Sequence, residues 1–303
     1  MGADTEVEAS SARPDAAASS RPSEAVAFGS LGVAAFSFSL PATRLALHGL
    51  TPGFVGLGRG VVGAVLAGML LLILRPPRPR GRQWLRLATT GAGVVVGFPV
   101  LTAAALQNVT AAHGAVVVGL LPAATAVFAV LRGGERPSAP FWAACAAGTG
   151  CVLLFAWTQD RGGISPWDGA ALAAVVLGGL GYAEGGTLSR DLGGWQVICW
   201  ALVLTAPLLV VPVAMALPGQ VPVRPEAWVG FAYLSVVSML LGFFAWYRGL
   251  ALGGVARIGQ LQLAQPLLTL AWSALLLGEH VGVPTLLAAL GVIGSVGVTQ
   301  RTR

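Results

Sequence analysis

The sequence predicts an all-α integral membrane protein whose ten transmembrane helices form two inverted five-helix repeats. Three observations lead to this prediction: long apolar runs, a shortage of charge and a duplicated motif. Of the 303 residues, 55% are hydrophobic and 10% are charged, and the mean hydropathy is +0.78. A soluble domain has about 25% charged residues. The chain therefore has too little charge to cover a water-facing surface.

Ten apolar runs, each long enough to cross about 30 Å of hydrocarbon, follow one another from Val26 onward. The links are short, so sequential helices should be antiparallel neighbours. A closed β-barrel is excluded, because the runs are twice as long as barrel strands and do not alternate. The predicted spans are 26–47, 54–74, 84–107, 113–131, 139–157, 168–189, 195–217, 226–247, 256–277 and 282–299.

Residues 1–25 are polar and rich in Ala, Ser and Pro. They contain no apolar core, which excludes a cleaved signal peptide and predicts a disordered cytoplasmic tail. The three cysteines lie in apolar runs without metal-ligand spacing and are expected to pack rather than to form a disulfide.

All 18 basic residues are arginines, and they gather in alternate links between the spans. This pattern fits the positive-inside rule better than it fits a nucleic-acid-binding surface. With both termini cytoplasmic, 14 of the 18 arginines lie inside. A composition rich in Ala, Gly and Arg suggests a GC-rich bacterial genome, so we expect a multi-pass protein of the bacterial inner (plasma) membrane. The inside arginines are Arg13, Arg21, Arg75, Arg78, Arg80, Arg82, Arg86, Arg132, Arg136, Arg190, Arg248, Arg257, Arg301 and Arg303.

A short motif occurs twice, 144 residues apart. The first copy is Leu121-Pro122-Ala-Ala-Thr followed by Gly134-Glu135. The second copy is Gln265-Pro266-Leu-Leu-Thr followed by Gly278-Glu279. Two five-helix units, 26–157 and 166–299, would have opposite orientations, because each contains an odd number of helices. This inverted-topology arrangement is typical of secondary transporters, in which the halves meet around a site at mid-membrane.

These residues also resemble a known family. The blocks that carry the resemblance are Ala104-Ala105-Leu106-Gln107, Ala111-Ala112, Leu121-Pro122 and Gly134-Glu135-Arg136-Pro137, with Gly249-Leu250-Ala251, Gln265-Pro266 and Leu277-Gly278-Glu279 as the second copy. Over about residues 26–300 the chain resembles the drug/metabolite transporter superfamily, EamA type. Arg59 is similar to an arginine often found in the second helix of that family.

The resemblance implies a ten-helix bundle with both ends cytoplasmic that moves small molecules by alternating access. We therefore expect a secondary-active transporter, an exporter of small organic metabolites or drugs, that uses no cofactor. Two alternatives are an integral membrane enzyme acting on lipid-like substrates and a membrane scaffold. The enzyme would need paired acidic or histidine residues at one depth, and the repeat argues against the scaffold. A homodimer is compatible with either class.

Glu184 is the clearest candidate functional residue, because it is the only carboxylate well inside a predicted span. Beside Tyr182, it could bind a cationic group or carry a coupling proton. The alternative is an ion pair with an arginine near the cytoplasmic end of the sixth span.

Gln262 and Gln265 precede Pro266 and share one helix face, whereas Gln260 points elsewhere. Two interpretations stay open: a cavity lined by these amides at a proline kink, or hydrogen bonds that hold packed helices together.

The remaining candidates lie near predicted span ends. Two interpretations are open for Gln107, Asn108 and His113: substrate contacts, or an exposed turn at the outer face. We expect Arg44 and Arg59 near the outer mouth. Glu135 and Glu279, with Pro122 and Pro266, are interpreted as structural or gating residues. Each glutamate is expected to cap the next helix or to pair with a base, because the helix dipole disfavours a carboxylate at a C-terminus.

Overall fold

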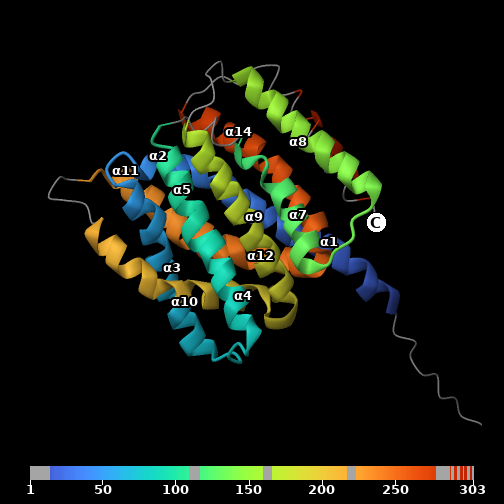
Figure 1. Cartoon of the computed structure of the whole chain (residues 1–303), viewed down its shortest axis with the longest axis horizontal. Coiled ribbons are helices and arrows are strands. Elements are labelled where there is room, and N and C mark those ends of the chain that lie inside the picture. The colour runs from blue at the N-terminus through green and yellow to red at the C-terminus, as the bar shows by residue number, and fades with distance from the viewer. Residues whose placement is uncertain are drawn as a thin grey trace, which may run out of the picture.

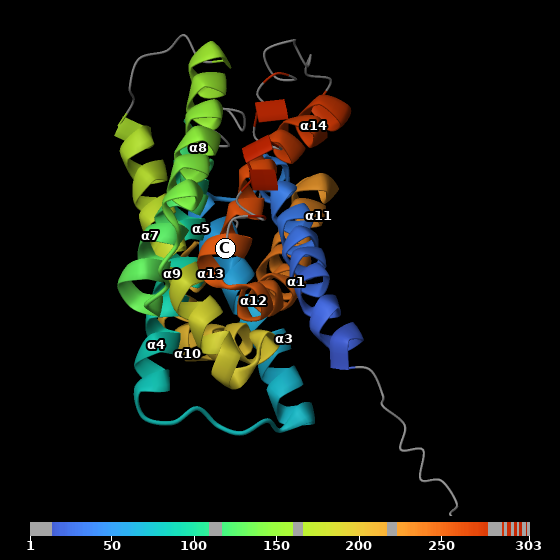
Figure 2. The ribbon, with the colours of Figure 1, turned by 90° about the vertical axis from the view of Figure 1, so that its right-hand side faces the viewer.

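The structure is a computed structural model in which the helices run side by side in one bundle (Figure 1). It describes residues 14–108, 117–159, 166–216 and 223–277, and also 287, 290, 291, 294, 295, 297, 298 and 301. All regular secondary structure in these described residues is helical. Seen from the side, the link that follows α3 and leads into α4 closes one end of the bundle (Figure 2).

The helices are numbered as in Figure 1, and their bounds follow in chain order. The segments η1 and η2 are π-helical and η3 is a 3-10 helix. The elements are α1 (Pro14–Ser37), α2 (Ser39–Ala46), α3 (Pro52–Leu74), α4 (Arg82–Thr90), η1 (Gly91–Gly97), α5 (Phe98–Ala105), α7 (Leu121–Gly133), α8 (Ala139–Gln159), α9 (Pro166–Leu192), α10 (Gly194–Met215), α11 (Pro225–Ala232), η2 (Tyr233–Leu241), α12 (Gly242–Gly253), α13 (Val255–Gly259), η3 (Gln260–Ala264) and α14 (Gln265–Leu277).

Six helical stretches of the described residues are long and apolar enough to cross a bilayer. An uninterrupted run of about 20 apolar residues matches the hydrocarbon thickness, so these stretches fit membrane spans. They are Pro22–Ala46, Pro52–Leu74, Arg82–Ala105, Gly169–Leu192, Gly194–Met215 and Pro225–Gly253.

The predicted N-terminal tail is too long. Helix α1 begins at Pro14 and not after residue 25. Proline at the start of a helix has no N–H to leave unpaired, and the following alanines favour helix. The residues before Pro14 lie outside the described part of the chain.

The first predicted span is interrupted at Phe38, where α1 ends and α2 begins. The carbonyl of Ser37, freed by the break, accepts a hydrogen bond from Thr269 Oγ1 at 2.7 Å, and Ser37 Oγ accepts one from Trp272 Nε1 at 3.0 Å. A buried carbonyl needs such a partner. Helix α14 therefore stabilises the break in the first span.

Several elements recur at the offset of the sequence motif. Helices α7 and α14 both have 13 residues, and their first residues, Leu121 and Gln265, are 144 apart. The π-helical segments end at Gly97 and Leu241, again 144 apart. A π-helical segment within an α-helix is rare and often marks a functional site.

Glycines allow the closest helix contacts in the core. A Cβ atom on Gly93 would lie 3.0 Å from the Cα of Gly181 and would collide with the carbonyl oxygen of Leu177. Segment η1 therefore rests directly on the backbone of α9, as small residues permit in membrane bundles.

We predict that Gly93→Ala destabilises the protein, because the added methyl group must displace the backbone of α9. Overpacking of this kind costs about 1–3 kcal/mol. Thermal unfolding of the detergent-solubilised protein should show a lower midpoint. The matched control is Gly150→Ala on α8, where an added Cβ meets nothing within 4 Å. Equal midpoints for the two variants would contradict this account of the contact.

Candidate functional site

A small cavity of about 30 Å³ lies in the middle of the bundle. Its lining residues come from nine elements: α1, α2, α3, η1, α5, α9, η2, α12 and α14. Two of them, Val94 of η1 and Ser238 of η2, occupy positions 144 residues apart. Solute pockets usually enclose about 300–1,000 Å³, so this conformation is closed around little more than a water molecule. The lining residues are Phe36, Ser39, Leu40, Arg59, Val94, Phe98, Tyr182, Ser238, Phe243 and Gln265.

Arg59 brings a positive charge to this cavity. Arg59 is only 7% exposed, and its Nε atom is buried without a hydrogen-bond partner in the described residues. Among the described residues, the Arg59 guanidinium makes no ion pair with a carboxylate. An arginine remains charged in proteins, and an unpaired buried charge costs several kcal/mol. The cavity therefore presents an uncompensated cation. Arg59, expected near the outer mouth, is thus buried against this cavity.

Aromatic side chains form the wall beside Arg59. The ring centroids of Phe36 and Phe243 are 4.9 Å apart, and those of Tyr182 and Phe243 are 5.8 Å apart. Across the cavity, the hydroxyl groups of Ser39 and Ser238 share a hydrogen bond of 2.8 Å. The lining thus combines one cation, three hydroxyl-bearing side chains, one amide and an apolar wall.

The predicted glutamine cluster is buried next to this site. Gln260, Gln262 and Gln265 all have buried side chains, and Gln265 lines the cavity. The amide group of Gln262 lies within reach of the Tyr182 hydroxyl, but neither its nitrogen nor its oxygen makes a well-formed hydrogen bond within the described residues. Buried amides are normally hydrogen-bonded. The unpaired groups of Gln262 and Gln265 therefore leave hydrogen-bonding capacity for a polar solute or water.

A kink at Pro266 was one of two open interpretations, but Pro266, like Pro122, lies at the start of a helix. Each is the second residue of a helix, α7 or α14. Proline is well tolerated there, since the N–H it lacks would be unpaired anyway. A 3-10 turn, η3, ends immediately before α14 and carries the three glutamines. The carbonyl oxygen of Pro122 accepts a long hydrogen bond of 3.4 Å from Gln260 Nε2.

Gln107 and Asn108 lie in a separate cleft of about 430 Å³ with Arg44 and His48. Both are exposed, as the interpretation of an exposed turn expected. Arg44 Nη1 donates to the carbonyl of Leu106 at 2.9 Å. His113, predicted beside them, lies outside the described residues.

An apolar contact connects the lining of this cleft with the lining of the central cavity. Leu40 lines the cavity, Leu106 lines the cleft, and both are buried against each other with Leu47. Leu40 and Arg44 are four residues apart on α2, which is about 6 Å along the helix axis.

Glu184 is held in a clamp and does not line the cavity. Its carboxylate accepts hydrogen bonds from Arg86 Nε of α4, at 2.8 Å, and from Arg132 Nε of α7. The Glu184 side chain is 2% exposed. This is the ion pairing that the sequence offered as the alternative to solute binding. The clamp joins α4, α7 and α9 at the end predicted to be cytoplasmic.

Glu135 caps a helix, but a distant one. Its two carboxylate oxygens accept hydrogen bonds from the N–H groups of Val255, at 2.9 Å, and Ala256, at 2.8 Å, at the start of α13. Arg190 Nη2 donates to the same carboxylate at 2.7 Å. A carboxylate at a helix N-terminus is favoured by the dipole and by the free N–H groups. Glu135 thus joins the link after α7 to α13, whereas Glu279 lies outside the described residues.

Sequence reasoning missed several residues of these sites. Ser39 and Ser238 could have been found as small polar residues inside apolar spans, but many such residues only bond their own helix. Arg86 and Arg132 were assigned to the inside face without a partner, because pairing across 98 and 52 residues needs the fold.

Comparison with known proteins identifies similar chains over nearly the whole length. A model of the EamA-like transporter family matches residues 24–157 and, separately, 165–300. The uncharacterized transporter YdeK of Bacillus subtilis is 48% identical over 281 residues, which cover 90% of this chain and 96% of YdeK. A probable terminal-alkyne amino-acid exporter of Streptantibioticus cattleyicolor is 26% identical and covers 90% of this chain and 92% of its own. A crystal structure with 20% identity has a similar fold, with a TM-score of 0.73 over 91% of this chain and 96% of that one.

We predict that Glu135→Ala loosens the start of α13. Hydrogen bonds to a charged group contribute about 1.5–3 kcal/mol, so amide exchange at Val255 and Ala256 should accelerate at least about tenfold. Hydrogen exchange read by mass spectrometry checks this. Glu226→Ala, which removes an exposed carboxylate on α11, is the control and should leave these amides unchanged. If the exchange of α13 does not respond to Glu135→Ala, the cap does not stabilise it.

Proposed function

The chain belongs to the EamA-like transporter family, and we propose that it is a secondary-active exporter of small organic solutes that carry a carboxylate. The observation that carries this proposal is the buried Arg59 guanidinium, which faces the central cavity without a carboxylate partner among the described residues. A planar guanidinium matches a carboxylate with two parallel hydrogen bonds. A solute carboxylate would therefore supply the missing counter-charge.

The cavity lining also selects the rest of the solute. Phe36, Phe98 and Phe243 suit an apolar body, while Ser39, Ser238 and Gln265 offer hydrogen bonds around the carboxylate. The relative from Streptantibioticus cattleyicolor is named an exporter of a terminal-alkyne amino acid. An amino acid with an apolar side chain has the carboxylate and the apolar body that this lining favours.

Ten spans in two inverted repeats would build this cavity from matching halves. The two separate family matches and the 144-residue offset of α7 and α14 support this arrangement. The packing supports it as well, because α1 packs on α12 and α5 packs on α9. In a five-helix repeat the first span corresponds to the sixth and the third to the eighth. The contact of the first span with the eighth is therefore equivalent to the contact of the sixth span with the third.

Alternating access would open the two ends of the cavity in turn. The end with Arg44 would be closed by the apolar contact of Leu40 with Leu106. The opposite end is closed by the Glu184 clamp and the Glu135 cap. This conformation is therefore nearer to opening on the Arg44 side. The arginine distribution supports an orientation with that side outside and both termini cytoplasmic in a bacterial inner membrane.

An ion gradient or the solute's own gradient would supply the energy. Glu184 is poorly placed as a proton carrier, because its carboxylate would first have to leave both Arg86 and Arg132. We assign it to the cytoplasmic gate instead.

We predict that Arg59→Gln weakens transport of an apolar amino acid or carboxylate. The loss of a charge-assisted pair should raise the KM by about 10- to 100-fold. Uptake and efflux by purified protein in liposomes, across a panel of carboxylates and their uncharged amides, checks this. Arg224→Gln is the control for loss of one exposed arginine. The proposal fails if the wild type moves amides and carboxylates equally well, or if Arg59→Gln leaves carboxylate transport unchanged.

A further inference from the structure

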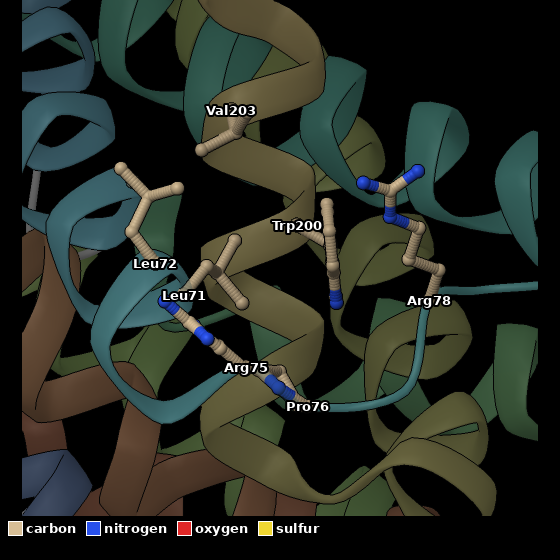
Figure 3. Close-up of a pocket in the computed structure, with 8 residues that line it drawn as sticks. Leu71, Leu72, Arg75, Pro76, Arg78, Trp200 and Val203 are labelled. Carbon is tan, nitrogen blue, oxygen red and sulfur yellow. The ribbon is translucent and has the colours of Figure 1, made fainter.

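A cleft of about 700 Å³ opens on the outer surface of the bundle, between the end of α3 and helix α10, away from the central cavity. Leu71, Leu72 and Val203 form its apolar part, and Gly68 leaves room above Val203. Arg75, Arg78 and Trp200 form its other end (Figure 3). The cleft is thus apolar along α3 and cationic where α3 ends.

The surroundings of the cleft face hydrocarbon. Leu72 and Ile73 beside it are 75% and 74% exposed, and Leu208 on α10 is 73% exposed. Such a surface is stable only against lipid chains. Trp200 makes an edge contact with Trp84, with ring centroids 5.6 Å apart. Tryptophans gather at the level of the lipid headgroups, so the cationic end of the cleft lies at the membrane interface.

Arg75 is held in place by an unusual backbone. Among the residues that the structure describes, Arg75 is the one non-glycine residue with a positive φ, which is 45°. Its N–H bonds the carbonyl of Leu71 at 2.9 Å and so ends α3. A left-handed conformation is unfavourable for a non-glycine residue. Glycine would adopt this conformation more easily. We therefore attribute the presence of an arginine at position 75 to a role of its side chain.

The guanidinium groups of Arg75 and Arg78 have no counter-charge from the residues that the structure describes. Among the described residues, neither Arg75 nor Arg78 makes an ion pair. Their side chains lie on either side of Trp200 in Figure 3. Both are exposed, so both are free to turn toward a group bound at the mouth of the cleft.

We propose that this cleft is a binding site for an anionic phospholipid. The phosphate would lie between Arg75 and Arg78 over Trp200, and one acyl chain would follow Leu71, Leu72 and Val203. The seven-residue step from Gly68 to Arg75 gives the cleft a length of about 10 Å, enough for the upper part of a chain. Basic pockets between membrane helices favour anionic headgroups. A zwitterionic headgroup would bring its ammonium group close to the guanidiniums.

The test compares two lipids with identical acyl chains, one with an anionic and one with a zwitterionic headgroup. Delipidated full-length protein is titrated with phosphatidylglycerol or phosphatidylcholine of identical chains, and bound lipid is counted by native mass spectrometry. Two arginines at about 1 kcal/mol each predict a preference for phosphatidylglycerol of roughly thirtyfold. The variant Arg75→Gly with Arg78→Gln should lose that preference.

The choice of variants separates lipid binding from folding. Glycine suits the left-handed turn at residue 75, so thermal unfolding should show an unchanged or higher midpoint without lipid. Arg80→Gln removes the same charge from the same link without touching the cleft and should keep the preference. A wild-type protein that binds both lipids equally overturns the proposal. So does a preference that survives in the double variant or disappears in Arg80→Gln. Equal binding of soluble glycerol phosphate would indicate a phosphate site without a lipid chain and would also overturn it.

Discussion

One uncompensated charge organises the centre of this protein. Arg59 is buried among aromatic and small polar side chains, and no carboxylate of the described residues neutralises it. The carboxylate nearest along the chain to the lining residue Tyr182 is Glu184, and two other arginines hold it. The fold thus keeps its own anion away from its central cation. A site with this imbalance favours a solute that brings a negative charge with it.

The two ends of the cavity are closed by different physical means. Leu40 and Leu106 form an apolar contact that depends only on excluded water. The other end depends on charged hydrogen bonds from Glu184 and Glu135, which tie α4, α7, α9 and α13 together. Charged contacts of this kind have discrete partners and are either made or broken. They suit a gate that must hold firmly in one state and release completely in the other.

Local rules predicted the elements and part of their packing. Apolar run lengths located the six long helical stretches of the described residues, and the repeated motif anticipated the matching starts of α7 and α14. The Glu135 cap was foreseen as a type of contact, because the helix dipole and free N–H groups are local properties. Its partner α13 was not, since that depends on how distant helices meet. The contact of Arg59 with the cavity was not predicted for the same reason: depth along a span does not say which face points inward.

The most direct test asks whether Arg59 touches the solute. In liposomes, a transported amino acid labelled with ¹³C at its carboxylate can be paired with protein carrying ¹⁵N-labelled arginine. A bidentate guanidinium–carboxylate pair should give a ¹³C–¹⁵N dipolar coupling in the wild type that is absent in Arg59→Gln. Saturable transport by a wild-type protein that shows no such coupling would contradict the central role assigned to Arg59.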